Sequence, residues 1–145
     1  MTIGLKICHD RRIMHRDLKC ANVFLNSDGE CKLGDFNVSK VMKGGFLSTQ
    51  TGTPYYASPE IWKDRPYDAK SDIWSLGCII YEICALKPPF RAQDMGGLYK
   101  RVTEGNFSPI PARYSSELSH VIKQMLQVQP HRRPSALELL KMNCV

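Results

Sequence analysis

Features of several common protein classes are absent from this sequence. Its six cysteines form no C-x-x-C pair and no Cys/His cluster at the spacing of zinc ligands, which argues against a structural zinc site. No apolar run approaches the ~20 residues that span a bilayer, and no secretory signal is recognisable at Met1. No arginine-rich run interleaves with aromatic residues, as a single-strand nucleic-acid binder requires. We therefore expect neither nucleic acid nor membrane as a partner.

The cysteines occur singly along the chain, so we expect most of them to be buried, reduced thiols. This usage predicts a cytoplasmic location, with the nucleus or the cytoskeleton as alternatives. The cysteines are Cys8, Cys20, Cys31, Cys78, Cys84 and Cys144.

The composition is typical of one globular unit. The chain has 145 residues, of which 43% are hydrophobic and 23% charged, and a domain of this length removes roughly 68–70% of its unfolded surface from water. It contains no internal repeat and no Gly/Ser linker, so we draw no domain boundary within residues 1–145. The formal net charge of +6 suits anionic partners but does not indicate a fold.

The first part of the chain predicts a helix followed by a small hairpin. Apolar residues on one side indicate a helix over residues 1–12. Short apolar runs at residues 23–25 and 31–33 flank an Asp-Gly step, which is a strong hairpin signal. Residues 35–60 show no helical period, and we expect a long loop there, because loops of that length in compact domains are usually functional.

The second part of the chain predicts further helices. Residues 73–86 are apolar nearly all round, which indicates a buried helix, with Ser71 and Asp72 marking its start and Pro88-Pro89 its end. Three more helices are predicted near residues 94–103, 115–127 and 135–142. The expected fold is therefore mainly α with one small β-hairpin.

The irregular segment between the first helix and the hairpin carries the chemistry. His-Arg-Asp-Leu-Lys-Cys-Ala-Asn at residues 15–22, followed later by Asp35-Phe36, resembles the catalytic loop and the magnesium-binding motif of protein kinases. In that interpretation Asp17 accepts a hydrogen bond from the substrate hydroxyl and Lys19 contacts the transferring phosphate. Asn22 and Asp35 offer the hard oxygen ligands that Mg²⁺ prefers. Asp17 is expected to orient the hydroxyl more than to deprotonate it early, because a carboxylate is a weak base at neutral pH.

Each of these four side chains also has a structural explanation when it is considered alone. Asp17 or Asn22 could cap a turn, Lys19 could be a solvated surface residue, and Asp35 could pair with a neighbouring arginine. Four suitable residue types in one fixed pattern, with the hairpin in the expected place, favour the catalytic interpretation over separate explanations.

The resemblance extends over the whole chain. Thr-Gly-Thr-Pro-Tyr-Tyr-Ala-Ser-Pro-Glu at residues 51–60 is similar to the end of a kinase activation segment. Ser-Asp-Ile-Trp-Ser-Leu-Gly at residues 71–77 is similar to the start of the central helix of that family. These segments most resemble those of the NIMA-related serine/threonine kinases. Two further segments share this resemblance, Ala-Leu-Lys-Pro-Pro-Phe at residues 85–90 and Pro-Ile-Pro-Ala-Arg-Tyr-Ser at residues 109–115.

The resemblance implies a kinase C-terminal lobe with a long activation segment, with ATP and Mg²⁺ as cofactors and proteins as substrates. It also implies further roles for individual residues. Thr53 would bond near Asp17 and Lys19, and Phe24 would form the floor under adenine. Structural support would come from the pair Glu60–Arg133, from Asp72 beneath the catalytic loop, and from His15 and Phe36 in the apolar column that joins the two lobes.

Regulation is implied by the hydroxyl side chains before Gly52. Ser48, Thr49 and Thr51 are candidate phosphorylation sites, with Thr49 preferred, and Arg16 would pair with the added phosphate. A merely polar loop remains the alternative for each of these hydroxyls.

Two departures from the family pattern affect the expected activity. Asn37 follows Asp35-Phe36 where the family usually has glycine, and asparagine tolerates a left-handed backbone better than most residues. The sequence has no glycine-rich phosphate loop, strand lysine or glutamate partner before the catalytic loop, so the N-terminal β-rich lobe is expected to be absent. We therefore expect negligible phosphotransfer and weak Mg-ATP binding from the isolated chain.

Two hypotheses follow. The first is a fragment of a serine/threonine kinase that transfers the γ-phosphate of ATP to protein hydroxyls. The second is a non-catalytic, pseudokinase-like fragment that binds proteins, including a kinase or a lobe partner, through the surface that would face the other lobe. No sustained heptad is present to indicate a coiled coil.

Overall fold

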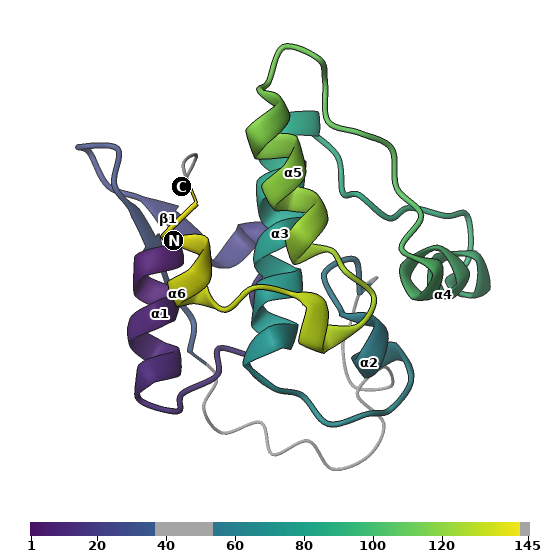
Figure 1. The fold of residues 1–145 in the computed structure, drawn as a ribbon, viewed down its shortest axis with the longest axis horizontal. Coiled ribbons are helices and arrows are strands. Elements are labelled where there is room, and N and C mark those ends of the chain that lie inside the picture. The colour runs from purple at the N-terminus through teal and green to yellow at the C-terminus, as the bar shows by residue number, and fades with distance from the viewer. Residues whose placement is uncertain (37–53, 143–145) are drawn as a thin grey trace.

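One long helix, α3 (Ala69–Ala85), lies at the centre of the computed structural model, which describes residues 1–36 and 54–142 (Figure 1). The other elements surround it, and α5 packs against α3, α6 against α1, and α2 against α4. The remaining helix bounds are α1 (Thr2–Asp10), α2 (Pro59–Trp62), α4 (Met95–Glu104), α5 (Ser116–Met125), α6 (Ala136–Leu139), and the 3-10 helices η1 (Cys20–Asn22) and η3 (Pro130–Arg132). The fold is mainly helical with one small sheet, as predicted.

The sheet is an antiparallel hairpin of β1 (Val23–Leu25) and β2 (Cys31–Leu33), in which Phe24 pairs with Lys32. Its turn is held by Asn26, whose side-chain oxygen accepts hydrogen bonds from the backbone N–H groups of Asp28 and Glu30 at 3.1 and 2.7 Å. Gly29 has φ 78°, a conformation that favours glycine. The two strands have the bounds predicted from the sequence, residues 23–25 and 31–33.

Helix α3 begins earlier than predicted. Its N-cap is Asp68, whose side chain accepts bonds from the N–H groups of Lys70 and Ser71, while the Ser71 hydroxyl accepts one from the Asp68 N–H. This reciprocal capping box extends the helix by a turn, so Ser71 and Asp72 lie inside it and do not mark its boundary. At the other end, Leu86 takes the left-handed conformation with φ 56° and terminates the helix before the prolines.

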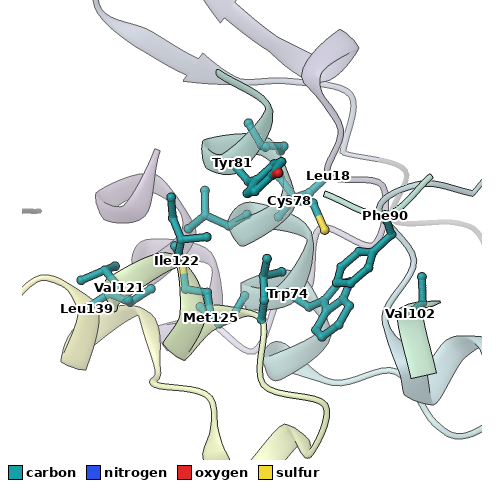
Figure 2. Packing of buried hydrophobic residues seen from close by; sticks show 14 of the residues in the cluster. Leu18, Trp74, Cys78, Tyr81, Phe90, Val102, Val121, Ile122, Met125 and Leu139 are labelled. Carbon is teal, nitrogen blue, oxygen red and sulfur yellow. The ribbon is translucent and has the colours of Figure 1, made fainter. Parts of the chain in front are cut away.

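The core forms around α3. The indole of Trp74 stacks on the ring of Phe90 with centroids 5.2 Å apart and planes 8° from parallel, and both side chains are fully buried (Figure 2). From the opposite side, Ile122 and Met125 of α5 are buried at the same cluster. The all-round burial expected for α3 is incomplete, because Ile83 near its C-terminal end is 54% exposed.

The three later helices begin close to their predicted starts; α4 also ends where predicted, within one residue, whereas α5 and α6 end earlier. Asp94 and Ser115 cap α4 and α5 through side-chain bonds to backbone N–H groups, and Ser135 forms a capping box at α6. Helix α6 is shorter than the predicted 135–142 because Lys141 and Met142 bond three residues back, as in a turn, and not four.

Two other expectations are corrected. The one-turn helix α2 lies at the end of the predicted loop, where its few residues gave no periodic signal. Among the cysteines in the described part of the chain, only Cys78 and Cys84 are buried, whereas Cys8 and Cys20 are half-buried and Cys31 is exposed. All five are free thiols, and Cys144 lies outside the described residues.

Candidate active site

The segment between α1 and η1 is held from below by a buried carboxylate of α3. Asp72 is fully buried, and its two oxygens accept hydrogen bonds from the backbone N–H of His15 at 3.0 Å and of Arg16 at 3.1 Å. A buried carboxylate with such donors fixes the path of the chain that supplies them. The segment that carries Asp17 is therefore tied to the central helix.

Two further side chains, which the sequence did not predict, donate hydrogen bonds to the carboxylate of Asp72. His9 Nε2 of α1 donates to Asp72 at 2.8 Å, and the Tyr67 hydroxyl donates at 2.5 Å. Burial raises the pKa of the Tyr67 hydroxyl, and the adjacent Asp72 charge raises it further. Asp72 thus joins α1, residues 15 and 16, and the segment that leads into α3 at one point.

Asp17, Lys19 and Asn22 come together in one cluster. Lys19 Nζ lies 2.9 Å from Asp17 Oδ2, and the Asn22 side-chain amide donates to the Asp17 carbonyl at 2.8 Å and to Oδ2 at 3.3 Å. The Asp17 side chain is 13% exposed and that of Lys19 38%. The carboxylate is thus fixed in orientation while both side chains keep access to solvent.

His15 connects this cluster to the end of the hairpin. Its Nε2–H donates to the Gly34 carbonyl at 3.0 Å, and its Nδ1 accepts from the Asp17 N–H at 3.4 Å, two bonds that one tautomer satisfies together. The rings of His15 and Phe36 lie 4.5 Å apart. Arg16 and Asp35 have positive φ values of 68° and 56°. Such backbone strain persists where surrounding contacts hold it and is frequent at functional sites.

The hairpin brings Asp35 beside Asn22. The Gly34 N–H donates to the Asn22 carbonyl at 3.0 Å, so Asp35 directly follows the residue bonded to Asn22. The Phe24 ring lies over Gly34, where an added Cβ would meet the ring at 2.6 Å. A side chain at position 34 would therefore displace the Phe24 ring, which is 55% exposed and presents an apolar face.

The donor set of Asn22 and Asp35 fits Mg²⁺. Asn22 is buried and uses its amide nitrogen toward Asp17, which leaves its oxygen as an available ligand. Mg²⁺ is commonly held by one or two carboxylate or amide oxygens together with water and phosphate. Within residues 1–36 and 54–142, no group of three or more His, Cys, Asp or Glu side chains could hold a metal ion by itself.

The expected pair Glu60–Arg133 is present and buried. Arg133 Nη1 and Nη2 donate to the two Glu60 oxygens at 2.6 and 2.8 Å, and the Ser71 hydroxyl donates to the same carboxylate at 2.7 Å. The guanidinium also lies over the Trp74 ring, 4.9 Å from its centroid. This network fixes α2, and hence the end of the preceding segment, against α3.

A second network near the cluster was not predicted. The Tyr56 hydroxyl donates to Glu82 at 2.7 Å, and its backbone carbonyl accepts from the Ser75 hydroxyl at 2.9 Å. Burial and the bonds to Glu82 and Cys20 raise the pKa of Tyr56 well above its ordinary value. Cys20 follows Lys19 directly, so residues 54–58 lie beside the catalytic-loop segment.

Several predicted residues fall outside the described part of the chain. These are Ser48, Thr49, Thr51 and Thr53, together with Asn37.

Exposed apolar side chains accompany the cluster. They come from α1, from β1 and from the residue after Asp35, and they are Ile3, Ile7, Phe24, Leu25 and Phe36. Helix α1 contacts β2, and β1 pairs with β2, so these side chains come from adjoining elements. No helix in the described residues is both long and apolar enough to cross a membrane.

Comparison with known proteins identifies the family of the chain. A family model described as "Protein kinase domain" matches residues 1–145. Serine/threonine-protein kinase Nek3 of Mus musculus is 49% identical over 140 residues, covering 95% of this chain and 27% of the relative. Human serine/threonine-protein kinase Nek2 is 47% identical over 148 residues, covering 97% of this chain and 33% of the relative.

A fungal relative is similar to the same extent. The G2-specific protein kinase nim-1 of Neurospora crassa is 53% identical over 134 residues, covering 92% of this chain and 16% of the relative. The chain thus spans a third or less of the length of each of these relatives.

Proposed function

The chain belongs to the protein kinase family, among the NIMA-related serine/threonine kinases, and from this premise we propose that its site transfers the γ-phosphate of ATP to serine or threonine hydroxyls of proteins. One observation carries the proposal. Asp17, Lys19 and Asn22 are joined by hydrogen bonds, and Asp72 holds the backbone on which they depend.

Asp17 orients the substrate hydroxyl. Its Oδ2 is already bonded to Lys19 and approached by Asn22, so the remaining oxygen can accept a hydrogen bond from the incoming hydroxyl. Lys19, whose side chain is partly exposed, can bond a phosphate oxygen without leaving Asp17. Positioning and charge stabilisation of this kind supply most of the catalysis of phosphoryl transfer.

Asn22 and Asp35 would hold Mg²⁺, and Phe24 would contact adenine. When bound, the metal ion supplies positive charge that neutralises the phosphate oxygens. The exposed face of Phe24, fixed over Gly34, offers an apolar surface of the size of a base.

The proposal is tested by phosphotransfer to a generic protein substrate. Because the chain spans only part of its relatives, we would assay it both alone and as a chimera. In the chimera, the residues of human Nek2 that precede the matched segment are joined before Met1. We expect the chimera to transfer phosphate and Asp17→Asn to lower its rate at least about 10²-fold, the usual contribution of a positioned acid or base. Asp28→Asn, the same change in the exposed hairpin turn, should leave the rate unchanged.

A second candidate function is a protein-binding module without catalysis. The exposed apolar side chains of α1 and the hairpin favour it, because such patches commonly mark interaction surfaces. A chimera that folds and gains thermal stability with Mg-ATP, yet transfers no more phosphate than its Asp17→Asn form, would replace the catalytic proposal with this one.

A further inference from the structure

A loop and a helix that do not contribute to the Asp17–Lys19–Asn22 cluster form a second candidate site. The loop between α3 and α4 is anchored by Phe90, which is fully buried against Trp74 (Figure 2) and makes an edge contact with Phe107, with ring centroids 5.5 Å apart. Phe107 in turn meets the ring of Tyr81 at 5.8 Å. Because these aromatic side chains fix the loop from inside, the residues beside them project from a defined position on the surface.

A hollow of about 650 Å³ lies over this aromatic anchor. The residues that line it come from α3, from the loop, from α4 and, in the case of Ser108, from the segment after α4. They are Tyr81, Lys87, Pro88, Pro89, Arg91, Ala92, Gln93, Asp94, Gly97, Arg101 and Ser108. Asp94, Gly97 and Arg101 follow the spacing of one helix face, so α4 forms one wall.

The lining carries an excess of positive charge. Lys87, Arg91 and Arg101 are all exposed, and none makes an ion pair with another residue in the described part of the chain. Asp94, the single carboxylate among these lining residues, is engaged by the Gly97 N–H at 2.7 Å as the cap of α4. Cations gathered around a concave surface focus a positive potential toward its interior.

A second hollow of about 500 Å³ lies beside the end of α4, and its lining has a smaller excess of positive charge than the loop hollow. Glu104 lies there with Lys123 and Arg132. The loop hollow is therefore the stronger site for an anion.

We propose that the hollow formed by Lys87, Arg91 and Arg101 binds an acidic segment of a partner protein, rich in aspartate or glutamate. The charge of the lining selects carboxylates, and the exposed Ser108 hydroxyl adds a neutral donor. Single-stranded nucleic acid fits less well, because it requires exposed aromatic rings for stacking, and the one aromatic ring of the lining, Tyr81, is only 2% exposed. This binding site does not depend on phosphate transfer.

The test measures fluorescence anisotropy of a labelled Gly/Ser peptide with a central run of glutamates, against the same peptide with glutamines. The wild-type chain should bind the acidic peptide and not the glutamine peptide. The double variant Lys87→Glu/Arg91→Glu should lower the affinity for the acidic peptide about tenfold or more, because two attractive charges become repulsive. Both residues are exposed in the loop, so the double variant should fold. Arg101→Gln should weaken binding less and avoids placing a negative charge in the last turn of α4, where the helix dipole disfavours it.

The matched control is Lys32→Glu/Lys141→Glu, which changes the net charge equally at exposed positions outside this hollow. We expect it to alter the dissociation constant less than about twofold. Equal weakening by both double variants would assign the binding to overall charge and overturn the proposal, as would absence of binding. An oligothymidylate that binds more tightly than the peptide and depends on the same residues would instead indicate a nucleic-acid site. When the Lys87→Glu/Arg91→Glu changes are placed in the chimera, its Mg-ATP binding should stay the same, so failure of this proposal can be told apart from failure of the catalytic one.

Discussion

At the scale of single residues, Arg133 holds several segments of the chain together through hydrogen bonds. Besides its two bonds to Glu60, its guanidinium donates to the carbonyls of Gln127, Lys70 and Val128 at 2.7, 2.9 and 3.2 Å. A fully satisfied buried guanidinium costs little to keep, but breaking such a pair on one side leaves an uncompensated charge and costs about 3–5 kcal/mol.

The Glu60 pair predicts a dependence of stability on pH. Burial raises the pKa of Glu60, but the bonds from Arg133 and Ser71 more than offset this, so the net pKa lies below its ordinary value. A carboxyl group whose pKa is lower in the folded than in the unfolded protein stabilises the fold at pH values above its unfolded-state pKa of about 4.3. This stabilisation is lost as the pH falls through the folded-state pKa. We expect Glu60→Gln, which cannot ionise, to have a lower Tm than wild type at neutral pH.

The measurement compares the two Tm curves as pH falls from about 7 to about 3. The gap between wild type and Glu60→Gln should narrow below about pH 4.5, because the wild type alone loses this contribution there. Curves that stay parallel throughout would contradict this role for Glu60.

The cysteines predict an order of chemical reactivity. Burial raises the pKa of the Cys78 thiol well above its ordinary value, whereas Cys31 is exposed on the hairpin. Because the thiolate is the reactive form, we expect a thiol reagent to label Cys31 first and Cys78 only after unfolding. Mass spectrometry of labelled peptides on a Cys144→Ser background checks this order, and early labelling of Cys78 would show that α3 opens readily.

The sequence predicted that Asp17, Lys19 and Asn22 come together because their types and order form a recognisable motif. It did not predict that His9 and Tyr67 would donate to Asp72, or that Tyr56 would bond Glu82. These partners come from separate elements, and only the packing of those elements brings them together.

At the scale of elements, the contact of α3 with α5 depends on Gly77. A Cβ at this position would lie 2.9 Å from Met125 Cβ and 3.0 Å from Leu126 Cδ2. The two helices therefore approach as closely as they do because one residue of α3 has no side chain.

Gly77→Ala should destabilise the protein despite the better helix propensity of alanine. The substitution gains up to about 1 kcal/mol in propensity, but overpacking typically costs about 1–3 kcal/mol. We expect a net loss of up to about 2 kcal/mol in the free energy of unfolding, measured by urea titration. Gly96→Ala, in the exposed first turn of α4, is the control and should be neutral or stabilising; equal effects at both positions would contradict the packing explanation.

The elements that the sequence predicted well carry their own local signals. The hairpin has its Asp-Gly turn, and α4 and α5 have the cap residues Asp94 and Ser115. The start of α3 was placed too late because Asp68 and Ser71 are both good caps, and only the structure shows that they act together. Helix α2 is too short to give a period, and its stability depends on the distant Arg133.

At the scale of the whole molecule, the exposed apolar surface of α1 and the hairpin predicts self-association of the isolated chain. Ile7 is 46% exposed and Leu25 70%. We expect Ile7→Glu/Leu25→Lys to reduce both the binding of a hydrophobic dye and the sedimentation coefficient at high concentration, because it interrupts this surface. Leu86→Lys, at a position 83% exposed beyond the end of α3, is the control and should change neither. Unchanged dye binding in the double variant would contradict the prediction.

The hydrogen bonds of Asp72 also bear on the stage of folding at which the site forms. Its bond to the His15 backbone joins residues 57 positions apart, and the Glu60–Arg133 pair spans 73. Non-local contacts of this kind form late, after the entropy of closing long loops has been overcome. The bonds of Asp72 to residues 15 and 16 are therefore expected to form only together with the rest of the tertiary structure. On heating, the order of this segment and the tertiary structure should disappear in a single transition.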